Sequence, residues 1–540
     1  MPASKRIALN NVAPPTKATN NSQQLFLSSR ANEIFIAVVG PAGAGVGTAA
    51  TALKRFLEDV RGDDGNHFDV HIVKASDSIA RWAGAKKRFT PSTEARKSID
   101  DRIAMQNLGD EFRKDTRDNA AVMRGVVEEI REMRSRASGL DLGEVDGKPR
   151  AFIIESLRHP AEAHFLRRLY QDAFHLVGVV CEPEKRKRRL LEKLFDKRDR
   201  TKSENILQVE SFMERDANAP EKYGQHVADA FQEADFFVDN SIETEDVDET
   251  GMNDALRRFL GLVTGKEVFR PTTAETAMND AHSAQLRSAC MSRQVGAALV
   301  DAAGNVVATG TNEVPKAGGG LYGESFRAEE IGHDHRCLFR ETKFCSSNKE
   351  QNEIIEELFE QFPELVVGKD RGSVFDKVRR TRLGGLIEFS RAVHAEMDAI
   401  LSAARIGVSP QGCRLFVTTF PCHYCARHIV SAGITEVQYI EPYPKSRAQA
   451  LHGDSITMDS SIALRKEAAG EDALVDGKVL FRPFVGVAPR MYRHVFLKDR
   501  DYKNRVTGVH ELGVPEWATF PLFTKRYTEL EEELVLDNPS

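Results

Sequence analysis

The sequence predicts an α/β protein with two sheet-based units, and three observations lead to this fold class. Up to residue 250, short apolar runs alternate with helical stretches, as in a parallel sheet covered by helices. A glycine-rich loop at 40–48 joins the first of these runs to a helix. Beyond residue 250, a helix, a β-hairpin, a long insertion and a helix, strand, helix, strand series predict a second unit. The 540 residues are enough for two or three domains.

Composition narrows the class of protein. The chain has 75 Lys and Arg against 81 Asp and Glu, and this net charge of −6 does not favour a nucleic-acid partner. Seven cysteines, an odd and sparse number, indicate reduced thiols and a cytoplasmic location. The apolar run at 34–39 is far too short to span a bilayer, no signal peptide is visible, and no membrane partner is expected. Residues 1–30, rich in Asn, Ser, Pro and Thr, predict a disordered tail.

The first strand, loop and helix suggest a phosphate site. Ile34–Val39 reads as a buried strand, and a helix follows from Ala49. Between them, glycines and a threonine can turn backbone N–H groups toward a phosphate at the helix start: Gly40, Gly43, Gly45, Gly47 and Thr48. The motif G-x-x-x-x-G-K-[ST] requires Lys where this chain has Val46, so the loop is a degenerate Walker A and phosphoryl transfer is not favoured. The alternatives are nucleotide binding and a tight turn without a ligand.

The following strands and helices continue the first unit. Strands are expected at 67–73, 151–154, 174–180 and 236–240, with a largely helical stretch at 103–133. The 40–48 loop, the 153–162 segment with Glu155, and the basic 184–190 stretch together resemble the nucleoside-monophosphate-kinase group of P-loop proteins. That resemblance implies a P-loop kinase-like domain at 31–250, in which the basic stretch forms a phosphate-clamping lid. A solvated helix face is the alternative for the basic stretch. Residues 241–250, acidic and polar, predict a linker.

The most informative motif lies in the second unit. His394 and Glu396 form H-x-E, and Cys422 and Cys425 follow in P-C-x-x-C, a pattern typical of zinc nucleobase deaminases. His394, Cys422 and Cys425 supply three zinc ligands and leave the fourth position for water. Glu396 is then expected to be catalytic and to carry protons. The alternative, two buried cysteines and a surface histidine, fits poorly with a strand-to-helix context in which a helix start favours the thiolate.

Further motifs place this unit in a family. A capping box at 272–275 opens a helix, and a hairpin is expected at 295–312. With the motifs at 293–297, 309–315, 394–396, 421–426 and 432–434, this order resembles the cytidine deaminase-like fold and, within it, the deoxycytidylate deaminase group. The resemblance implies an α/β/α domain at 251–540 with an insertion at 316–390 and a C-terminal extension. It also implies three substrate-binding residues, Asn312 at the sugar hydroxyl, Arg293 toward the phosphate and Tyr443 in the pocket. Asn312 is otherwise a turn residue that ends a strand.

The insertion holds two more expectations. His333, His335, Cys337 and Cys345 lie within 13 positions and could bind a second, structural zinc, as in some deoxycytidylate deaminases. Their spacing fits no standard finger, so loose surface residues are the alternative. Residues 350–365 are amphipathic and predict a helix that packs on the core or on a neighbouring subunit.

The combination of both units resembles the bacterial anti-phage dCTP deaminases. It implies a zinc-dependent hydrolase that converts dCTP to dUTP and depletes the dCTP pool during infection. A dCMP deaminase of pyrimidine metabolism and a nucleic-acid cytidine deaminase are the alternatives. The resemblance further implies a homo-oligomer, and the degenerate loop suggests a regulatory nucleotide in the first unit.

Overall fold

The computed structural model describes most of the chain, namely residues 22, 31–60, 67–86, 98–241, 251–265, 267–323, 334–340, 343–443, 446–459, 477–498 and 500–511. The predicted tail, apart from residue 22, and the predicted linker, apart from residue 241, lie outside these residues. Across the described ranges, the helices are too short or too polar for any of them to cross a membrane.

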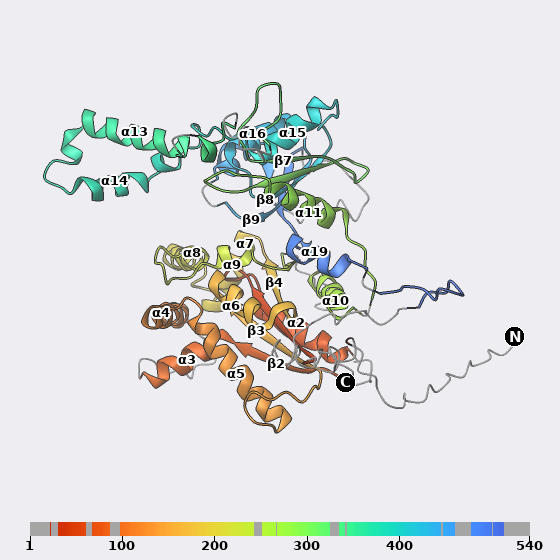
Figure 1. Cartoon of the computed structure of the whole chain (residues 1–540). Helices are drawn as coiled ribbons and strands as arrows, with labels where there is room; N and C mark the ends of the chain where they lie inside the picture. Colours follow the sequence, from red (N-terminus) through yellow and green to blue (C-terminus); the bar gives the residue numbers. More distant parts are fainter. Residues whose placement is uncertain are drawn as a thin grey trace, which may run out of the picture.

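The first sheet has six strands in the order β12-β5-β4-β1-β3-β2 (Figure 1). The pairs are parallel except β12 with β5, which confirms the predicted parallel sheet. Every residue of β1 is buried because helices cover both faces. The strands are β1 (Glu33–Val39), β2 (Asp69–Lys74), β3 (Arg150–Leu157), β4 (Phe174–Val180), β5 (Phe236–Asp239) and β12 (Gly486–Val487).

Alternate residues of β1 face two different cores, as the two-residue period of a strand requires. Phe35, Ala37 and Val39 pack with α3, α5 and α6, whereas Ile34 and its partners on the other face pack with α2 and α10. The helices are α2 (Val46–Asp59), α3 (Ala75–Ala85), α4 (Ile99–Thr116), α5 (Ala121–Ser138), α6 (Pro160–Tyr170), α7 (Pro183–Leu194), α8 (Ser203–Ala217), α9 (Val227–Phe231) and α10 (Gly251–Thr264), with a 3₁₀ turn at Gln171–Ala173.

The single helical stretch predicted at 103–133 is wrong, because two helices occupy it. Ser98 opens α4 with a capping box, and Arg117 ends it in the left-handed conformation, with φ of 53°. Asp118 then accepts from the backbone N–H of Ala120 at 2.9 Å, and α5 begins at Ala121. No Gly or Pro marks this break, so the apolar period alone did not show it.

The second sheet also has six strands, in the order β10-β11-β9-β8-β6-β7. The predicted hairpin is present, since β6 pairs antiparallel with β7 and also with β8, and the remaining pairs are parallel. The apolar core on one face includes α15 and α16, and α11 covers the other face, which gives the predicted α/β/α layers. The strands are β6 (Gly296–Val300), β7 (Val306–Thr311), β8 (Arg414–Thr419), β9 (Glu436–Glu441), β10 (Ile456–Thr457) and β11 (Val479–Pro483). The helices are α11 (Thr273–Gln285), α15 (Ala395–Arg405), α16 (His423–Ser431), α17 (Ala448–His452) and α19 (Pro489–Phe496).

Segments beyond residue 250 complete the first unit. Helix α10 packs against α2 and β5, and β12 extends the first sheet only a few residues after β11 has joined the second. The capping box predicted at Thr272 is present. Its buried Glu275 also accepts from Arg258 Nη1 at 2.6 Å and from the backbone N–H of Val487 at 2.8 Å. One carboxylate therefore ties α10, α11 and β12 together, and the predicted domain ranges stay a prediction.

The insertion forms a helical arm that projects from the second sheet in Figure 1. It contains α13 (Ser346–Gln361) and α14 (Arg371–Arg379), and short 3₁₀ turns at Cys337–Phe339, Pro363–Leu365 and Leu383–Gly385. The helix predicted at 350–365 corresponds to α13 and the turn that follows it. It packs against α14 and the 383–385 turn, with Ile355 and Phe359 buried.

Candidate active site

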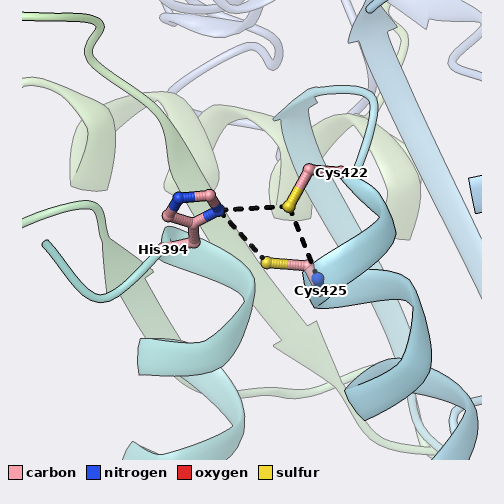
Figure 2. A group of neighbouring side chains, drawn as sticks. All are labelled: His394, Cys422 and Cys425. Carbon is pink, nitrogen blue, oxygen red and sulfur yellow. Dashed lines mark hydrogen bonds between the residues drawn. The ribbon is translucent and has the colours of Figure 1, made fainter. Parts of the chain in front are cut away.

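Two helix starts bring the His and Cys side chains of the motif together. His394 is the N-cap residue of α15, and Cys422 is the N-cap residue of α16 after β8. Cys425 lies in the first turn of α16, so its thiol and that of Cys422 share one face. His394 Nδ1 is 3.4 Å from the Sγ atom of each cysteine (Figure 2).

The geometry of this group fits zinc. The three donor atoms lie within 4.8 Å of one another. Ordinary Zn–N and Zn–S bonds in a tetrahedral site place ligand atoms about 3.6 Å apart, close to the separations seen here. One nitrogen and two sulfurs form a donor set that zinc accepts, and a fourth position stays open to a water or a substrate. Within the described ranges, this is the one group of three or more side chains suited to a metal ion.

Hydrogen bonds inside the group favour a thiolate at Cys422. The thiol and the backbone N–H of Cys425 both hydrogen-bond to its sulfur, and they hold the pKa of Cys422 at about 4. The same hydrogen bond, together with burial, raises the pKa of Cys425. A hydrogen bond with Cys422 raises the pKa of His394 to about 9. Since the thiolate is the form that binds a metal, the start of α16 is prepared for a cation.

Glu396 lies beside this group in the first turn of α15. Only 3% of the residue is exposed, and burial raises the pKa of its carboxyl to about 7. It lines the same cavity as His394 and Cys422, but it is not one of the three clustered ligands. A buried carboxyl with a pKa near neutrality is suited to taking up and releasing a proton.

The cavity in front of this group, called the His–Cys cavity below, has a volume of about 590 Å³. The three residues predicted to bind substrate, Asn312, Arg293 and Tyr443, all line it. The amide of Asn312 already makes two backbone hydrogen bonds, accepting from Val295 N at 2.6 Å and donating to the carbonyl of Arg293 at 2.5 Å. One amide hydrogen and one lone pair remain for a ligand, so contact with a sugar stays a prediction.

Arg293 has a partner that the sequence did not reveal. Its Nη1 lies 2.6 Å from Glu441 Oε1, and its guanidinium lies 5.7 Å from the ring centre of Tyr443. Glu441 also accepts from Thr419 Oγ1 at 2.8 Å. Because Glu441 neutralises the arginine, a phosphate at this position has to compete with a carboxylate. The position of Glu441, two residues before Tyr443 at the end of β9, was the available signal.

The first unit forms part of the wall of the His–Cys cavity. Ala217 and Asn218, at the end of α8, line it together with Ala228 and Asp229 of α9. These residues are more than 160 positions before His394 and belong to no recognisable motif, so sequence reasoning missed them. The cavity is therefore assembled from both units.

The glycine loop at 40–48 lines a second cavity, of about 740 Å³, called the glycine-loop cavity below. Gly43 and Gly45 have φ of 82° and 95°, and a Cβ at Gly45 would lie 2.1 Å from the side chain of Asn240. A Cβ at Gly40 would lie 2.9 Å from the carbonyl of Val179, and one at Gly47 would lie 3.0 Å from Glu155. The loop thus needs its glycines, and Thr48 is exposed at the cavity.

Basic residues from elsewhere line this cavity where the Walker lysine is missing. Val46 packs in the apolar core and is 7% exposed. Five basic side chains line the cavity, against the single carboxylate of Glu155: Arg55, Arg102, Arg158, Arg189 and Lys193. Arg189 comes from the stretch predicted to be a lid. The structure places the loop, Glu155 and that stretch together, as the resemblance implied.

The predicted second zinc site is only partly described, because His333 lies outside the described residues. Cys337 Sγ lies 3.9 Å from Ser346 Oγ, and Cys345 Sγ lies 3.5 Å from Ser292 Oγ. Neither cysteine, nor His335, belongs to a metal-binding group of three or more in the described part of the chain. This second zinc stays a prediction.

Comparison with known proteins agrees with the site. Residues 271–441 match the family model "Cytidine and deoxycytidylate deaminase zinc-binding region". The deoxycytidylate deaminase of Enterobacteria phage T2 is 29% identical over 174 residues, which cover 32% of this chain and 82% of that protein. A dCMP deaminase from the cyanophage S-TIM5, solved with dCMP and dUMP, aligns over 34% of this chain and 93% of its own, at 21% identity and a TM-score of 0.21.

The first unit also has structural neighbours. Shikimate kinase from Bacteroides thetaiotaomicron aligns over 43% of this chain and 98% of its own, at 15% identity and a TM-score of 0.23. The protein therefore combines a zinc-binding deaminase region with a second α/β unit whose neighbours include P-loop kinases.

Proposed function

We propose that this protein is a zinc-dependent hydrolase that deaminates a free deoxycytidine nucleotide, with dCTP converted to dUTP as the preferred reaction. The observation that carries the proposal is the placement of His394, Cys422 and Cys425 around one point, with buried Glu396 in the same cavity. The match of residues 271–441 to the zinc-binding deaminase model supports it.

The residues divide the chemistry between them. His394, Cys422 and Cys425 would hold zinc, which supplies a Lewis acid that makes water a nucleophile near neutral pH. Glu396 accepts a proton from that water at its carboxylate and delivers it to the cytosine ring nitrogen and to the leaving amino group. Water and a cytosine nucleotide give ammonia and a uracil nucleotide, so the reaction needs no other reactant. The burial of Glu396 keeps its proton away from bulk solvent.

Features of the cavity support a small nucleotide as substrate. A volume of about 590 Å³ lies within the range of small-molecule sites. Asn312, Arg293 and Tyr443 are proposed to contact the sugar, the phosphate end and the nucleotide respectively. The named relatives are deoxycytidylate deaminases, so dCMP is the second candidate substrate. The net charge of −6 does not favour a nucleic-acid strand.

Further parts of the proposal rest on the union of the two units. A regulatory nucleotide is proposed at Gly40, Gly43, Gly45, Gly47 and Thr48, where basic side chains replace the missing lysine. Depletion of dCTP as a defence against phage is proposed from the resemblance of the whole arrangement. A homo-oligomer is proposed on the same ground, and light scattering of the purified protein tests it.

The decisive experiment supplies each cytosine substrate separately. Purified full-length protein is incubated with dCTP, dCMP, CTP, deoxycytidine and a cytosine-containing oligonucleotide, and the products are identified by mass spectrometry. We expect uracil product from dCTP first and from dCMP second. Product from the oligonucleotide alone would overturn the free-nucleotide proposal, and product from none of them would overturn the deaminase proposal.

A further inference from the structure

The two cavities share one short piece of chain at the end of α8. Asp216 lies on the side of the glycine loop, and Ala217 and Asn218 line the His–Cys cavity. The two sites are separate in sequence, but three consecutive residues touch the structures that form both. This arrangement gives the sites a direct physical connection.

The carboxylate of Asp216 holds the glycine-loop side. It is 1% exposed, and its two oxygens accept from different partners, the backbone N–H of Ala42 at 2.7 Å and Arg158 Nη1 at 2.6 Å. Arg158 itself lines the glycine-loop cavity. A buried carboxylate that loses such partners is strongly destabilised, so any ligand that takes them forces Asp216 to rearrange.

The backbone around Arg158 is fixed, so its guanidinium is the part able to respond. Its N–H donates to Glu162 Oε2 at 2.8 Å, and its carbonyl accepts from the N–H of His226, also at 2.8 Å. Glu162 in turn is buried against Arg113, with Arg113 Nη2 2.8 Å from Glu162 Oε1. The side chain of Arg158 is 26% exposed.

The charge of the glycine-loop cavity defines its ligand. Five basic side chains and one carboxylate line it, together with the backbone of the loop. The Nε of Arg102 is buried without a hydrogen-bond partner, and burial lowers the pKa of that guanidinium. A cavity of this charge and of about 740 Å³ suits the polyphosphate of a nucleotide.

On the other side, the wall is tied to the His–Cys cavity. Asn218 Oδ1 lies 2.8 Å from His226 Nδ1, which precedes α9. Ala228 and Asp229 of α9 line the cavity, and α9 contacts β9, whose last residue is Glu441. A shift at 216–218 therefore reaches the wall of the cavity that Arg293 and Tyr443 also line.

We propose that the Arg158–Asp216 pair couples nucleoside polyphosphate binding in the glycine-loop cavity to substrate binding in the His–Cys cavity. The phosphate competes with Asp216 for Arg158 and for the N–H of Ala42, and the displaced carboxylate moves residues 217 and 218. Asp216 is a positioning residue, so the coupling changes KM and leaves kcat nearly constant. The inference rests on the proposed deaminase function for its kinetic readout only.

The test uses full-length protein and ATP, which carries no cytosine, with inorganic triphosphate in a parallel arm. Saturating ATP is expected to change the KM for dCTP or dCMP about fivefold or more, the lower range of typical coupling. In Asp216→Asn the change disappears while ATP binds at least as tightly, since Arg158 loses its internal competitor. Arg158→Gln, at a partly exposed residue, loses both ATP affinity and the change in KM. An equal effect of inorganic triphosphate would assign the site to the anion alone.

Arg215→Gln is the matched control. Arg215 lies in the same helix and pairs with Asp110 at 2.8 Å, but it is outside the lining of both cavities. It should keep the ATP effect. No binding of ATP or triphosphate to the wild-type protein, or an ATP effect that persists in Asp216→Asn and Arg158→Gln, would overturn the coupling.

Binding measurements separate this inference from the proposed function. Coupling between binding sites is reciprocal, so dCMP must change the affinity for ATP by the same factor as ATP changes the affinity for dCMP. Calorimetry with Glu396→Gln measures both affinities without turnover. Absence of product in the wild-type protein contradicts the deaminase, whereas independent affinities contradict the coupling.

Discussion

The two cavities of this protein are built in opposite ways. The His–Cys cavity takes its proposed metal ligands and proton carrier from two short stretches, 394–396 and 422–425, each at the start of a helix. The glycine-loop cavity takes its backbone from one stretch, but its basic side chains come from α2, α4, α7 and the loop after β3. Metal chemistry needs particular atoms at fixed positions, whereas an anion site needs positive charge and N–H groups from any source. A missing lysine can therefore be replaced, but a missing cysteine cannot.

The largest effect should follow from removing a ligand. Cys422→Ser takes away a thiolate from the group of three, and we expect zinc and activity to be lost together. Elemental analysis and product formation measure the two. Cys413→Ser is the matched control, a buried cysteine shortly before β8 whose thiol donates to the carbonyl of Ser409. If Cys422→Ser kept both zinc and activity, the self-contained character of this cavity would be disproved.

The second effect separates proton transfer from metal binding. Glu396→Gln should lower kcat by about 10²–10⁴-fold, the usual contribution of a positioned acid or base. Zinc content should stay unchanged, because Glu396 is not among the three clustered ligands. Full activity in this variant would contradict the proposed role. Loss of zinc instead would show that Glu396 belongs to the metal site.

The third effect concerns the replacement of the missing lysine. Arg102→Gln should weaken ATP binding about tenfold, since a hydrogen bond to a charged group is worth roughly 1.5–3 kcal/mol. Calorimetry measures the affinity, and kcat without ATP should not change. An unchanged affinity would mean that the other basic side chains carry the anion. Lys197→Gln, a charge change outside the lining of this cavity, serves as the control.

The smallest effect is expected at Arg293. Glu441 already pairs with it, and nearly half of the arginine side chain is exposed, so its net attraction for a phosphate is screened. Arg293→Gln should raise the KM by a few-fold at most, because exposed ion pairs contribute only about 0.2–1 kcal/mol. Steady-state kinetics measure this change. A loss of 100-fold or more would show that substrate displaces Glu441 and gains the full charge.

Much of each sheet followed from local pattern. Buried runs such as Ile34–Val39 predicted strands because a covered parallel strand is apolar on both faces. Thr272 predicted a helix start because its hydroxyl and Glu275 satisfy free backbone N–H groups, and the structure has this capping box. Position 117 escaped the same reasoning, because an arginine in the left-handed conformation carries no sequence signal.

The sequence by itself determined the chemistry, because the donor atoms of His394, Cys422 and Cys425 come from neighbouring turns of chain whose geometry is local. Only the tertiary structure decided what surrounds it. β12 joins the first sheet, Glu441 neutralises Arg293, and Asn218 forms a wall of the His–Cys cavity. These contacts join residues far apart in sequence, and they depend on how two layered units pack. No residue pattern at either end of such a contact announces its partner.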